Sequence, residues 1–278
     1  MLSYRHSFHA GNFADLLKHL VLVEVLGYLV SKEKPFDYID THAGAGIYRL
    51  TSAHAEKTGE YQEGIARIWT NHHPALSRYL AAVRAANPSG ELSCYPGSPK
   101  IAAPFLRAQD HGWLFELHPT DVKLLEEAFH SNRQCQVRQQ DGFQGLLSLL
   151  PPKSRRGVVL IDPSYELKED YERVFTVIEA AVRKFATGIY LLWVPVVDRK
   201  RVDHLERQFR KGSIRNVLLL ELGIRNDSDG HGMTSSCLLV VNPPWKLCGQ
   251  MEEILPLLRD AINGNGEAFF RIEQLVAE

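Results

Sequence analysis

Cysteine is scarce in this sequence, with four residues among 278 and no Cys-x-x-Cys pair. Such sparse thiols exclude a disulfide-stapled scaffold in a chain of this length, so we expect a reducing, cytoplasmic setting. An excess of one charge is also missing, because 32 basic and 33 acidic residues leave a net charge of -1. This balance excludes a polycationic chain, and any nucleic-acid partner therefore has to be held by a local basic patch.

Long hydrophobic runs are absent as well. No stretch approaches the roughly 20 apolar residues of a membrane-spanning helix, and the apolar run nearest the N-terminus, Leu20 to Val23, ends at Glu24. We therefore expect a soluble protein with neither an export signal nor a membrane partner. The histidines form no His-Glu-x-x-His motif and no ladder with cysteines, so we predict no metal site.

The sequence does contain an alternation of strand-like and helix-like segments. A helical pattern over 13–30, with Lys18 and Glu24 among its more polar positions, precedes the first strand candidate, Phe36 to Ile39. Later strand candidates are Trp113 to Leu117, Cys135 to Arg138, Val158 to Ile161, Gly188 to Val194, Val217 to Leu222 and Cys237 to Val241, with helical candidates Pro119 to Phe129, Tyr171 to Phe185 and Arg199 to Phe209. This alternation predicts an α/β fold with a mostly parallel sheet covered on both faces. We expect the last two strands to form an antiparallel hairpin at the sheet edge.

One interval is too long for this alternation. The 66 residues from 47 to 112 separate the first strand from the second, whereas a crossover between parallel strands needs only about a dozen. Helical patterns over 60–70 and 75–86 fill much of it, and Ser98 is placed to cap the helix that returns to the core. We predict a core made of residues 1–48 and 97–278, with a small inserted helical subdomain over 49–96.

A glycine turn follows the first strand, in the segment Asp40-Thr-His-Ala-Gly44-Ala-Gly46. Its glycines would let backbone N–H groups approach a ligand closely. The dinucleotide fingerprint needs a third glycine where this chain has Arg49, which disfavours a nicotinamide enzyme. The pattern instead resembles the first motif of methyltransferases that use S-adenosylmethionine, whose positive charge suits an acidic strand end such as Asp40. The alternative is a strand-to-helix turn without a ligand.

Further acidic residues follow the next two strands. Glu116 closes the second strand, where its carboxylate could accept hydrogen bonds from the ribose hydroxyls of such a cofactor. Asp141 and Gly142 follow the third strand, where the aspartate could accept a hydrogen bond from the exocyclic amine of the cofactor's adenine. The alternatives are a surface acid at Glu116 and a helix N-cap at Asp141.

The fourth strand ends in Asp162-Pro163-Ser164-Tyr165. The Asp162 carboxylate and the Pro163 carbonyl could accept the two N–H groups of an exocyclic amine on a base, which directs the nitrogen lone pair at a methyl donor. Tyr165 could stack on the base, and Asp162 could take the departing proton. The pattern predicts amino-group methylation, and the alternative is an ordinary Asp-Pro turn.

Two considerations limit where and on what this chemistry acts. A paired base cannot reach such a pocket, so the target has to be unpaired or flipped, a condition that RNA loops meet readily. A rival motif, Asn242-Pro243-Pro244-Trp245, matches the amino-methylating signature better by pattern alone. Because it follows the strand that we place last, remote from the glycine turn, we interpret it as structural.

Several long strings give the chain a family resemblance. Besides the segments at 40–46 and 162–165, they are YRHSFHAGNFADLLKH at 4–19, TGEYQEGIARIW at 58–69, YPGSP at 95–99, KFATGIY at 184–190 and NPPWK at 242–246. Over essentially its whole length the chain resembles the RlmJ family, which methylates N6 of one adenine in 23S ribosomal RNA. The resemblance implies a Rossmann-like class I methyltransferase sheet with a small helical insertion, S-adenosyl-L-methionine as cofactor and 23S ribosomal RNA as partner.

Site residues follow from the same resemblance. It implies that Asp162 is the catalytic acceptor, that Tyr4 contacts the RNA, and that the cofactor is held by His19, His42, Ser98, Glu116, Asp141 and Gly142. We add Lys18, beside His19, as a contact in the cofactor site, and His6, close to Tyr4 in sequence, as an RNA contact. The chain departs from the family signature at Ser164, where a second proline is expected. This change frees Pro163 from the pre-proline restriction, so its carbonyl is less rigidly aimed.

We therefore predict a monomeric S-adenosylmethionine-dependent methyltransferase that acts on N6 of one adenine in free or partly assembled 23S ribosomal RNA. One alternative is a DNA adenine-N6 methyltransferase. Another, motivated by Ser164, is a catalytically weakened nucleic-acid-binding protein linked to the use of external DNA.

Overall fold

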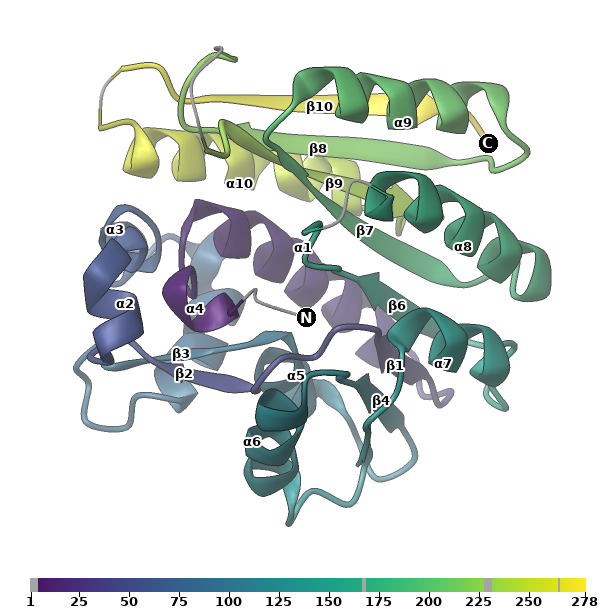
Figure 1. Ribbon diagram of the computed structural model, residues 1–278, viewed down its shortest axis with the longest axis horizontal. Coiled ribbons are helices and arrows are strands. Elements are labelled where there is room, and N and C mark those ends of the chain that lie inside the picture. Colours follow the sequence, from purple (N-terminus) through teal and green to yellow (C-terminus); the bar gives the residue numbers. More distant parts are fainter. Residues whose placement is uncertain (1–4, 167–168, 228–231, 265) are drawn as a thin grey trace.

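The structure is a computed structural model that describes residues 5–166, 169–227, 232–264 and 266–278 (Figure 1). Tyr4, which we predict to contact RNA, lies outside these residues. Within them, a sheet of eight strands organises the molecule, in the order β10-β8-β9-β7-β6-β1-β4-β5. None of the described helices is long and apolar enough to cross a lipid bilayer.

The sheet has a parallel part and an antiparallel part. The parallel strands are β1 (Asp37–Asp40), β4 (His111–Phe115), β5 (Cys135–Arg138), β6 (Gly157–Ile161) and β7 (Ile189–Val196). The antiparallel strands are β8 (Val217–Gly223), β9 (Ser235–Val241) and β10 (Phe269–Val276). β6 and β7 are buried along their whole length, as expected for strands covered on both faces. The predicted α/β class, with a mostly parallel sheet and an antiparallel C-terminal hairpin, is confirmed.

The place of the hairpin in the sheet differs from our expectation. β9 is neither the last strand nor an edge strand, because it lies between β7 and β8, and β10 forms the edge beside β8. Most side chains of β10 are only partly buried, and charged residues such as Arg271 and Glu273 alternate with Phe270 and Ile272. A search for apolar runs misses such a half-buried strand.

Helices cover both faces of the sheet (Figure 1). One face carries α1 (Phe13–Val30), α4 (Pro74–Ala85), α5 (Ser98–Ala102) and α10 (Leu247–Ile262). The other carries α7 (Gly142–Leu149), α8 (Asp170–Lys184) and α9 (Arg199–Lys211), and α6 (Pro119–Phe129) packs beside β5. The helices expected between the strands are confirmed to within two residues at their ends.

α1 lies at the centre of the molecule (Figure 1). Its start is fixed by Asn12, whose side chain accepts hydrogen bonds from two backbone N–H groups of the first turn. The polar positions Lys18 and Glu24 are buried together with most of the helix. Glu24 pairs with Arg78 of α4 at 2.7 Å, whereas Lys18 faces the end of β6. Since a buried charge requires a partner, the contacts of Lys18 matter for the site.

The long interval between β1 and β4 contains the insertion. At its base, β2 (Ile47–Arg49) pairs with β3 (Cys94–Pro96), and between them lie α2 (Ala53–Thr58), η2 (Glu60–Glu63), α3 (Ile65–Ile68) and α4. The expected helix over 60–70 is split in two at Gly64, whose backbone (φ -118°, ψ -110°) is not helical. Gly64 packs so closely on Gly11 that a Cβ would lie 2.1 Å from the Gly11 carbonyl oxygen, to which the N–H of Ile65 donates at 2.8 Å. Buried side chains of the insertion join the cluster around α1. The segment thus packs on the core, and its status as a separate subdomain over 49–96 stays a prediction.

Two further 3-10 helices complete the description. η1 (His6–Phe8) precedes α1, and η3 (Ala103–Phe105) follows α5 directly. η1 is tied to the insertion, because the Thr58 hydroxyl donates to the Phe8 carbonyl and the Phe8 and His54 rings stack at 4.2 Å. The N-terminal segment thus lies across the insertion.

Candidate active site

The carboxyl ends of the parallel strands meet at one edge of the sheet, and the predicted site residues follow them. Asp40 is in register with Leu114 of β4 and Leu160 of β6, so the loops after these strands are neighbours. They surround a cavity of about 340 Å³. Of the predicted residues, those that line this cavity are His6, Lys18, His19, His42, Gly44, Ser98, Glu116, Asp141, Gly142, Asp162 and Pro163. Asp40, Gly46 and Tyr165 do not line it.

The glycine turn is held by the carboxylate of Glu116, which follows β4. Gly44 has a φ of +60°, and a Cβ there would lie 2.2 Å from the Tyr48 hydroxyl oxygen, so glycine is required. Its N–H donates to Glu116 Oε2 at 2.8 Å, while Glu116 Oε1 accepts from the backbone N–H of His118 at 2.7 Å. Burial raises the pKa of Glu116. Glu116 is therefore not a surface acid, because it is fixed against the turn and faces the cavity.

Asp40 stabilises the glycine turn without lining the cavity itself. Its side chain is fully buried and accepts hydrogen bonds from the Tyr38 hydroxyl (2.6 Å), the Ser98 hydroxyl (2.7 Å) and the backbone N–H of His42 (3.3 Å). Burial raises the pKa of Asp40 to about 6. The expected N-cap at Ser98 is wrong, because its hydroxyl donates to Asp40 and Gly97 occupies the N-cap position of α5. Ser98 nevertheless lines the cavity.

Two histidines line the cavity as neutral rings. A hydrogen bond of 2.7 Å joins His19 Nδ1 to the Tyr95 hydroxyl, and burial lowers the pKa of His19 to about 3. His42 packs edge-on against Phe143 at 5.1 Å, and burial lowers its pKa to about 4. At neutral pH, neither ring adds a positive charge that would repel a cationic ligand.

Asp141 is the helix N-cap that we considered for it and also lines the cavity, whereas its contact with a cofactor stays a prediction. It is the N-cap of α7, accepting from the N–H of Gln144 at 3.0 Å, and its other oxygen pairs with Arg173 at 2.8 Å. The same residue lines the cavity. Position 142 requires glycine, because a Cβ there would lie 1.8 Å from the Thr41 carbonyl oxygen. With any larger residue, α7 could not approach the loop after β1 so closely.

Asp162 and Lys18 form a buried ion pair. Lys18 Nζ donates to Asp162 Oδ2 at 2.6 Å and lies 2.9 Å from Asp15 Oδ1, with the three side chains 4%, 15% and 1% exposed respectively. Burial alone would lower the pKa of Lys18, but the two carboxylates raise it, so Lys18 is an ammonium. Sequence reasoning placed Lys18 next to the cofactor and overlooked Asp15, although the i, i+3 spacing of the two residues on one helix was an available signal.

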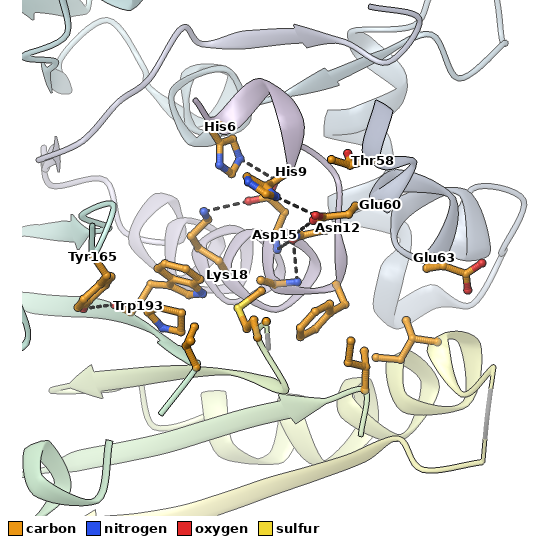
Figure 2. Close-up of a pocket in the computed structure, with 18 of the residues that line it drawn as sticks. His6, His9, Asn12, Asp15, Lys18, Thr58, Glu60, Glu63, Tyr165 and Trp193 are labelled. Carbon is orange, nitrogen blue, oxygen red and sulfur yellow. Dashed lines mark hydrogen bonds and ion pairs between the residues drawn. The ribbon is translucent and has the colours of Figure 1, made fainter. Parts of the chain in front are cut away.

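Figure 2 shows a second, larger cleft, of about 1090 Å³. The two share His6, Lys18, Asp162 and Ser164, so the carboxylate of Asp162 stands between them. The walls of the larger cleft include aromatic rings, arginines and part of the insertion, among them Phe13, Thr58, Glu60, Arg67, Tyr171, Trp193, Arg201 and Arg225. Sequence reasoning did not identify this cleft, because its walls come from segments far apart in the chain.

Tyr165 belongs to the larger cleft rather than to the smaller cavity. Its hydroxyl donates to the Trp193 carbonyl at 2.6 Å, and its ring contacts Tyr171 and Trp193 at centroid distances of 4.6 and 5.9 Å (Figure 2). Tyr165 has a φ of +52°, an uncommon conformation for a side chain of this size. Such strain at a cleft wall is consistent with a functional position.

The rival motif lies at the opposite end of the sheet. Val241, just before Asn242, pairs with Tyr190 near the start of β7, whereas Asp162 follows the far end of the neighbouring β6. The Asn242 side chain donates to two backbone carbonyls of the loop before β7, and Trp245 is 79% exposed. None of these motif residues lines the cavity or the larger cleft, which agrees with a structural role.

The cavity fits the cofactor that the glycine turn suggests. Its volume falls within the roughly 300–1,000 Å³ of small-molecule sites, and the carboxylates of Glu116 and Asp141 reach its wall. Carboxylates accept hydrogen bonds from hydroxyl and amino groups, and they stabilise a nearby positive charge. S-adenosylmethionine presents all three of these features.

Comparisons with known proteins agree with the geometry. The family model described as "Ribosomal RNA large subunit methyltransferase D, RlmJ" matches residues 33–273. The chain is 50% identical over 280 residues to "Ribosomal RNA large subunit methyltransferase J" of Escherichia coli K12, and 48% identical over 281 residues to the protein of that name from Haemophilus influenzae. Both matches cover 100% of each chain.

A solved structure shows the same fold. The crystal structure of protein LPL1258 from Legionella pneumophila superimposes with a TM-score of 0.89 and 39% sequence identity, covering 96% of this chain and 98% of that one. A family model over most of the chain and two full-length relatives near 50% identity leave one assignment. The chain belongs to the RlmJ family of large-subunit ribosomal RNA methyltransferases.

Proposed function

We propose that this protein transfers a methyl group from S-adenosyl-L-methionine to N6 of one adenine in 23S ribosomal RNA. The observation that carries the proposal is the position of Asp162 in the wall shared by two cavities. One cavity has the size and acceptors for the cofactor, and the other is large enough to admit a nucleotide beside it. A group at this boundary can contact both reactants, as transfer in line requires.

In this proposal the cofactor occupies the smaller cavity. Glu116 accepts hydrogen bonds from the ribose hydroxyls and Asp141 from the adenine amine, while His19, His42, Ser98 and Gly142 complete the wall. Lys18 borders it through the Asp162 pair, and Asp40 and Gly46 act indirectly, by shaping the turn. The bound cofactor supplies an electrophilic methyl group on a positively charged sulfur. Backbone N–H groups already orient both oxygens of Glu116, which supports its role as an acceptor for the ribose hydroxyls.

The target amine lies at the boundary of the two cavities. Asp162 and the Pro163 carbonyl accept its N–H groups, and Asp162 receives the proton released after transfer. Tyr165 packs on the base from the larger cleft, in which its hydroxyl is already bound to Trp193. His6 borders both cavities and contacts the RNA there, together with Tyr4.

The larger cleft also favours an unpaired substrate. A base inside a duplex cannot reach Asp162, because that carboxylate is only 15% exposed. Aromatic rings line the larger cleft, among them the half-buried Tyr165, and such rings suit unstacked bases. The acids Glu60, Glu63 and Asp198 reduce the positive charge that the arginines give to the same cleft. We therefore propose 23S ribosomal RNA, free or partly assembled, as the substrate of a cytoplasmic, monomeric enzyme without a metal. The insertion over 49–96 would form one wall for that RNA.

The test uses ribosomal RNA from a strain that lacks the modification. Labelled methyl donor is offered with naked 23S RNA, with assembled large subunits and with adenine-containing DNA, and the methylated position is mapped. Transfer to one adenine of the naked RNA supports the proposal. Preferred transfer to DNA would instead support the first alternative.

An Asp162→Asn variant separates catalysis from binding. It keeps the size of the side chain and removes its negative charge, so we expect transfer to be lost while calorimetry shows cofactor binding within about threefold of the original protein. Full activity in this variant would reject Asp162 as the acceptor. Absence of any cofactor binding by the unaltered protein would favour the nucleic-acid-binding alternative.

A further inference from the structure

Asp15 is a buried charge in the first turn of α1. Its side chain is 1% exposed, and its Oδ1 lies 2.9 Å from Lys18 Nζ, the nitrogen that also lies 2.6 Å from Asp162 Oδ2. The Lys18 side chain is 4% exposed and points at Asp15 (Figure 2). One ammonium is thus shared between two carboxylates in a place that water barely reaches.

The other oxygen of Asp15 holds the N-terminal segment. Asp15 Oδ2 accepts a hydrogen bond from the backbone N–H of Gly11 at 2.8 Å and lies 2.9 Å from His6 Nε2. Gly11 has a φ of +81° in the turn that leads into α1. His6 borders both the cavity and the larger cleft. Asp15 therefore connects the segment at the entrance of the site to the Lys18–Asp162 pair.

Because Asp15 and Asp162 share the Lys18 ammonium, the net charge next to a bound substrate changes. Burial alone would raise the pKa of Asp15, but His6 and Lys18 hold it well below its usual value, so Asp15 is ionised. Two carboxylates and one ammonium leave these three side chains with a net charge of -1. Among the described residues, Lys18 is the one hydrogen-bond partner of Asp162. Without Asp15, the whole ammonium charge would fall on Asp162, and the pair would be neutral.

Amino-group methylation needs that surplus negative charge. The amine nitrogen becomes positive as it accepts the methyl group, and it then releases a proton to a base. A negative site stabilises the developing charge most strongly where water is excluded. A neutral Lys18–Asp162 pair would offer less stabilisation, and its carboxylate would be drawn more tightly to the ammonium.

We propose that Asp15 is a positioning residue of the transfer reaction: it shares Lys18 with Asp162 and so leaves Asp162 free to bind the amine and offset its positive charge. The inference deepens the proposed function and rests on it. Asp15 touches neither reactant in this scheme, because it acts through Lys18.

The first test needs neither RNA nor cofactor. Unfolding midpoints are measured for the cofactor-free protein, Asp15→Asn, Lys18→Met and the double variant. Asp15→Asn should lower the midpoint in the original background and raise it in the Lys18→Met background, where it removes repulsion between two carboxylates that have lost their shared ammonium. Equal lowering in both backgrounds would show that Asp15 does not act through Lys18, and the proposal would be overturned.

The second test measures transfer to 23S RNA. For Asp15→Asn we expect kcat to fall roughly 10- to 100-fold, with KM for RNA and the cofactor Kd within about threefold, since the loss is one of orientation and charge at the reacting amine. In the Lys18→Met background, Asp15→Asn should cause no further fall.

Asp110→Asn is the matched control. Asp110 is also fully buried, pairs with Arg107 three residues earlier at 2.7 Å and accepts backbone N–H bonds, but it lies before β4 and outside both cavities. It should lower stability and leave kcat unchanged. An original-level kcat in Asp15→Asn, or an equal fall in Asp110→Asn, would refute the positioning role. If the unaltered protein itself transfers nothing to 23S RNA, the proposed function fails, while the unfolding cycle still decides whether Asp15 and Asp162 share Lys18.

Discussion

Replacing Lys18 by methionine removes the ammonium and keeps a side chain of similar length in the core. The two carboxylates that it contacts, Asp15 and Asp162, then lose the ammonium between them, at 1% and 15% exposure. Removing one partner of a buried pair costs about 3–5 kcal/mol. Because Asp162 keeps some contact with water, we expect a loss of about 3 kcal/mol in the free energy of unfolding at pH 7.

The loss should depend on pH in a defined direction. The pKa of Asp15 in the folded protein lies well below its ordinary value of 3.8, because His6 and Lys18 outweigh the effect of burial. Its ionisation therefore stabilises the protein above about pH 4, and this contribution disappears as the pH falls further. In Lys18→Met, His6 still contacts Asp15, but the ammonium is lost while burial remains, so we expect the pKa of Asp15 to be higher than in the original protein. The charge of Asp15 then costs stability at neutral pH, and protonation relieves this cost. The deficit of the variant should shrink between pH 7 and pH 4.

Urea unfolding at several pH values measures this deficit. The control is Lys100→Met, because Lys100 Nζ donates to a backbone carbonyl, that of Ala128, rather than to a carboxylate. Its loss should be about 1 kcal/mol and nearly independent of pH in this range. A deficit for Lys18→Met no larger than that of the control, or one that stays constant down to pH 4, would refute the shared-ammonium reasoning.

Three further predictions follow from the site. Gly142→Ala places a Cβ 1.8 Å from the Thr41 carbonyl oxygen and should weaken cofactor binding at least tenfold by calorimetry, whereas Gly249→Ala, with open space at its Cβ, should bind normally and gain about 0.5–1 kcal/mol of stability. Burial lowers the pKa of His42 to about 4 from 6.5, so the folded protein loses stability as pH falls below about 6.5. His42→Gln should reduce that slope by up to one proton in titrated unfolding curves. Trp245→Ser should leave methyl transfer unchanged, since Trp245 lines neither cavity; a large loss would return the rival motif to consideration.

Sequence patterns predicted most of the fold because its strands carry strong local signals. β6 and β7 are buried throughout and consist almost wholly of apolar residues, and α6 begins and ends at the expected residues. β10 was missed because charged residues interrupt its apolar pattern, and two of them, Arg271 and Glu273, pair with Glu206 and Arg210 of α9. The helix expected over 60–70 was wrong because Gly64 touches Gly11, a contact between distant segments that no local pattern encodes.

Some parts of the candidate site were likewise predictable from the sequence, and others were not. Residues directly after strands, such as Glu116 and Asp162, were predictable because parallel strands deliver them to one edge. Asp40 is the last residue of β1, but the hydroxyls of Tyr38 and Ser98 donate to its carboxylate, and only the packed structure reveals this. The larger cleft was not predictable, since its walls combine the insertion, α1 and the loops after β6 and β7.

The polar residues at the start of α1 were also misleading in the sequence. Asp15 lies three positions before Lys18 and four before His19, and the N-cap Asn12 lies three positions before Asp15, so these residues share one side of the helix, a pattern typical of a solvated surface. Here that face is buried against the carboxyl edge of the sheet. An ammonium between two buried carboxylates adds little stability, because apolar side chains of similar volume would serve the fold equally well or better. Since stability does not account for these charges, we propose that they serve the chemistry at Asp162, and the proposed function then puts the reacting centre at the N-terminal end of α1.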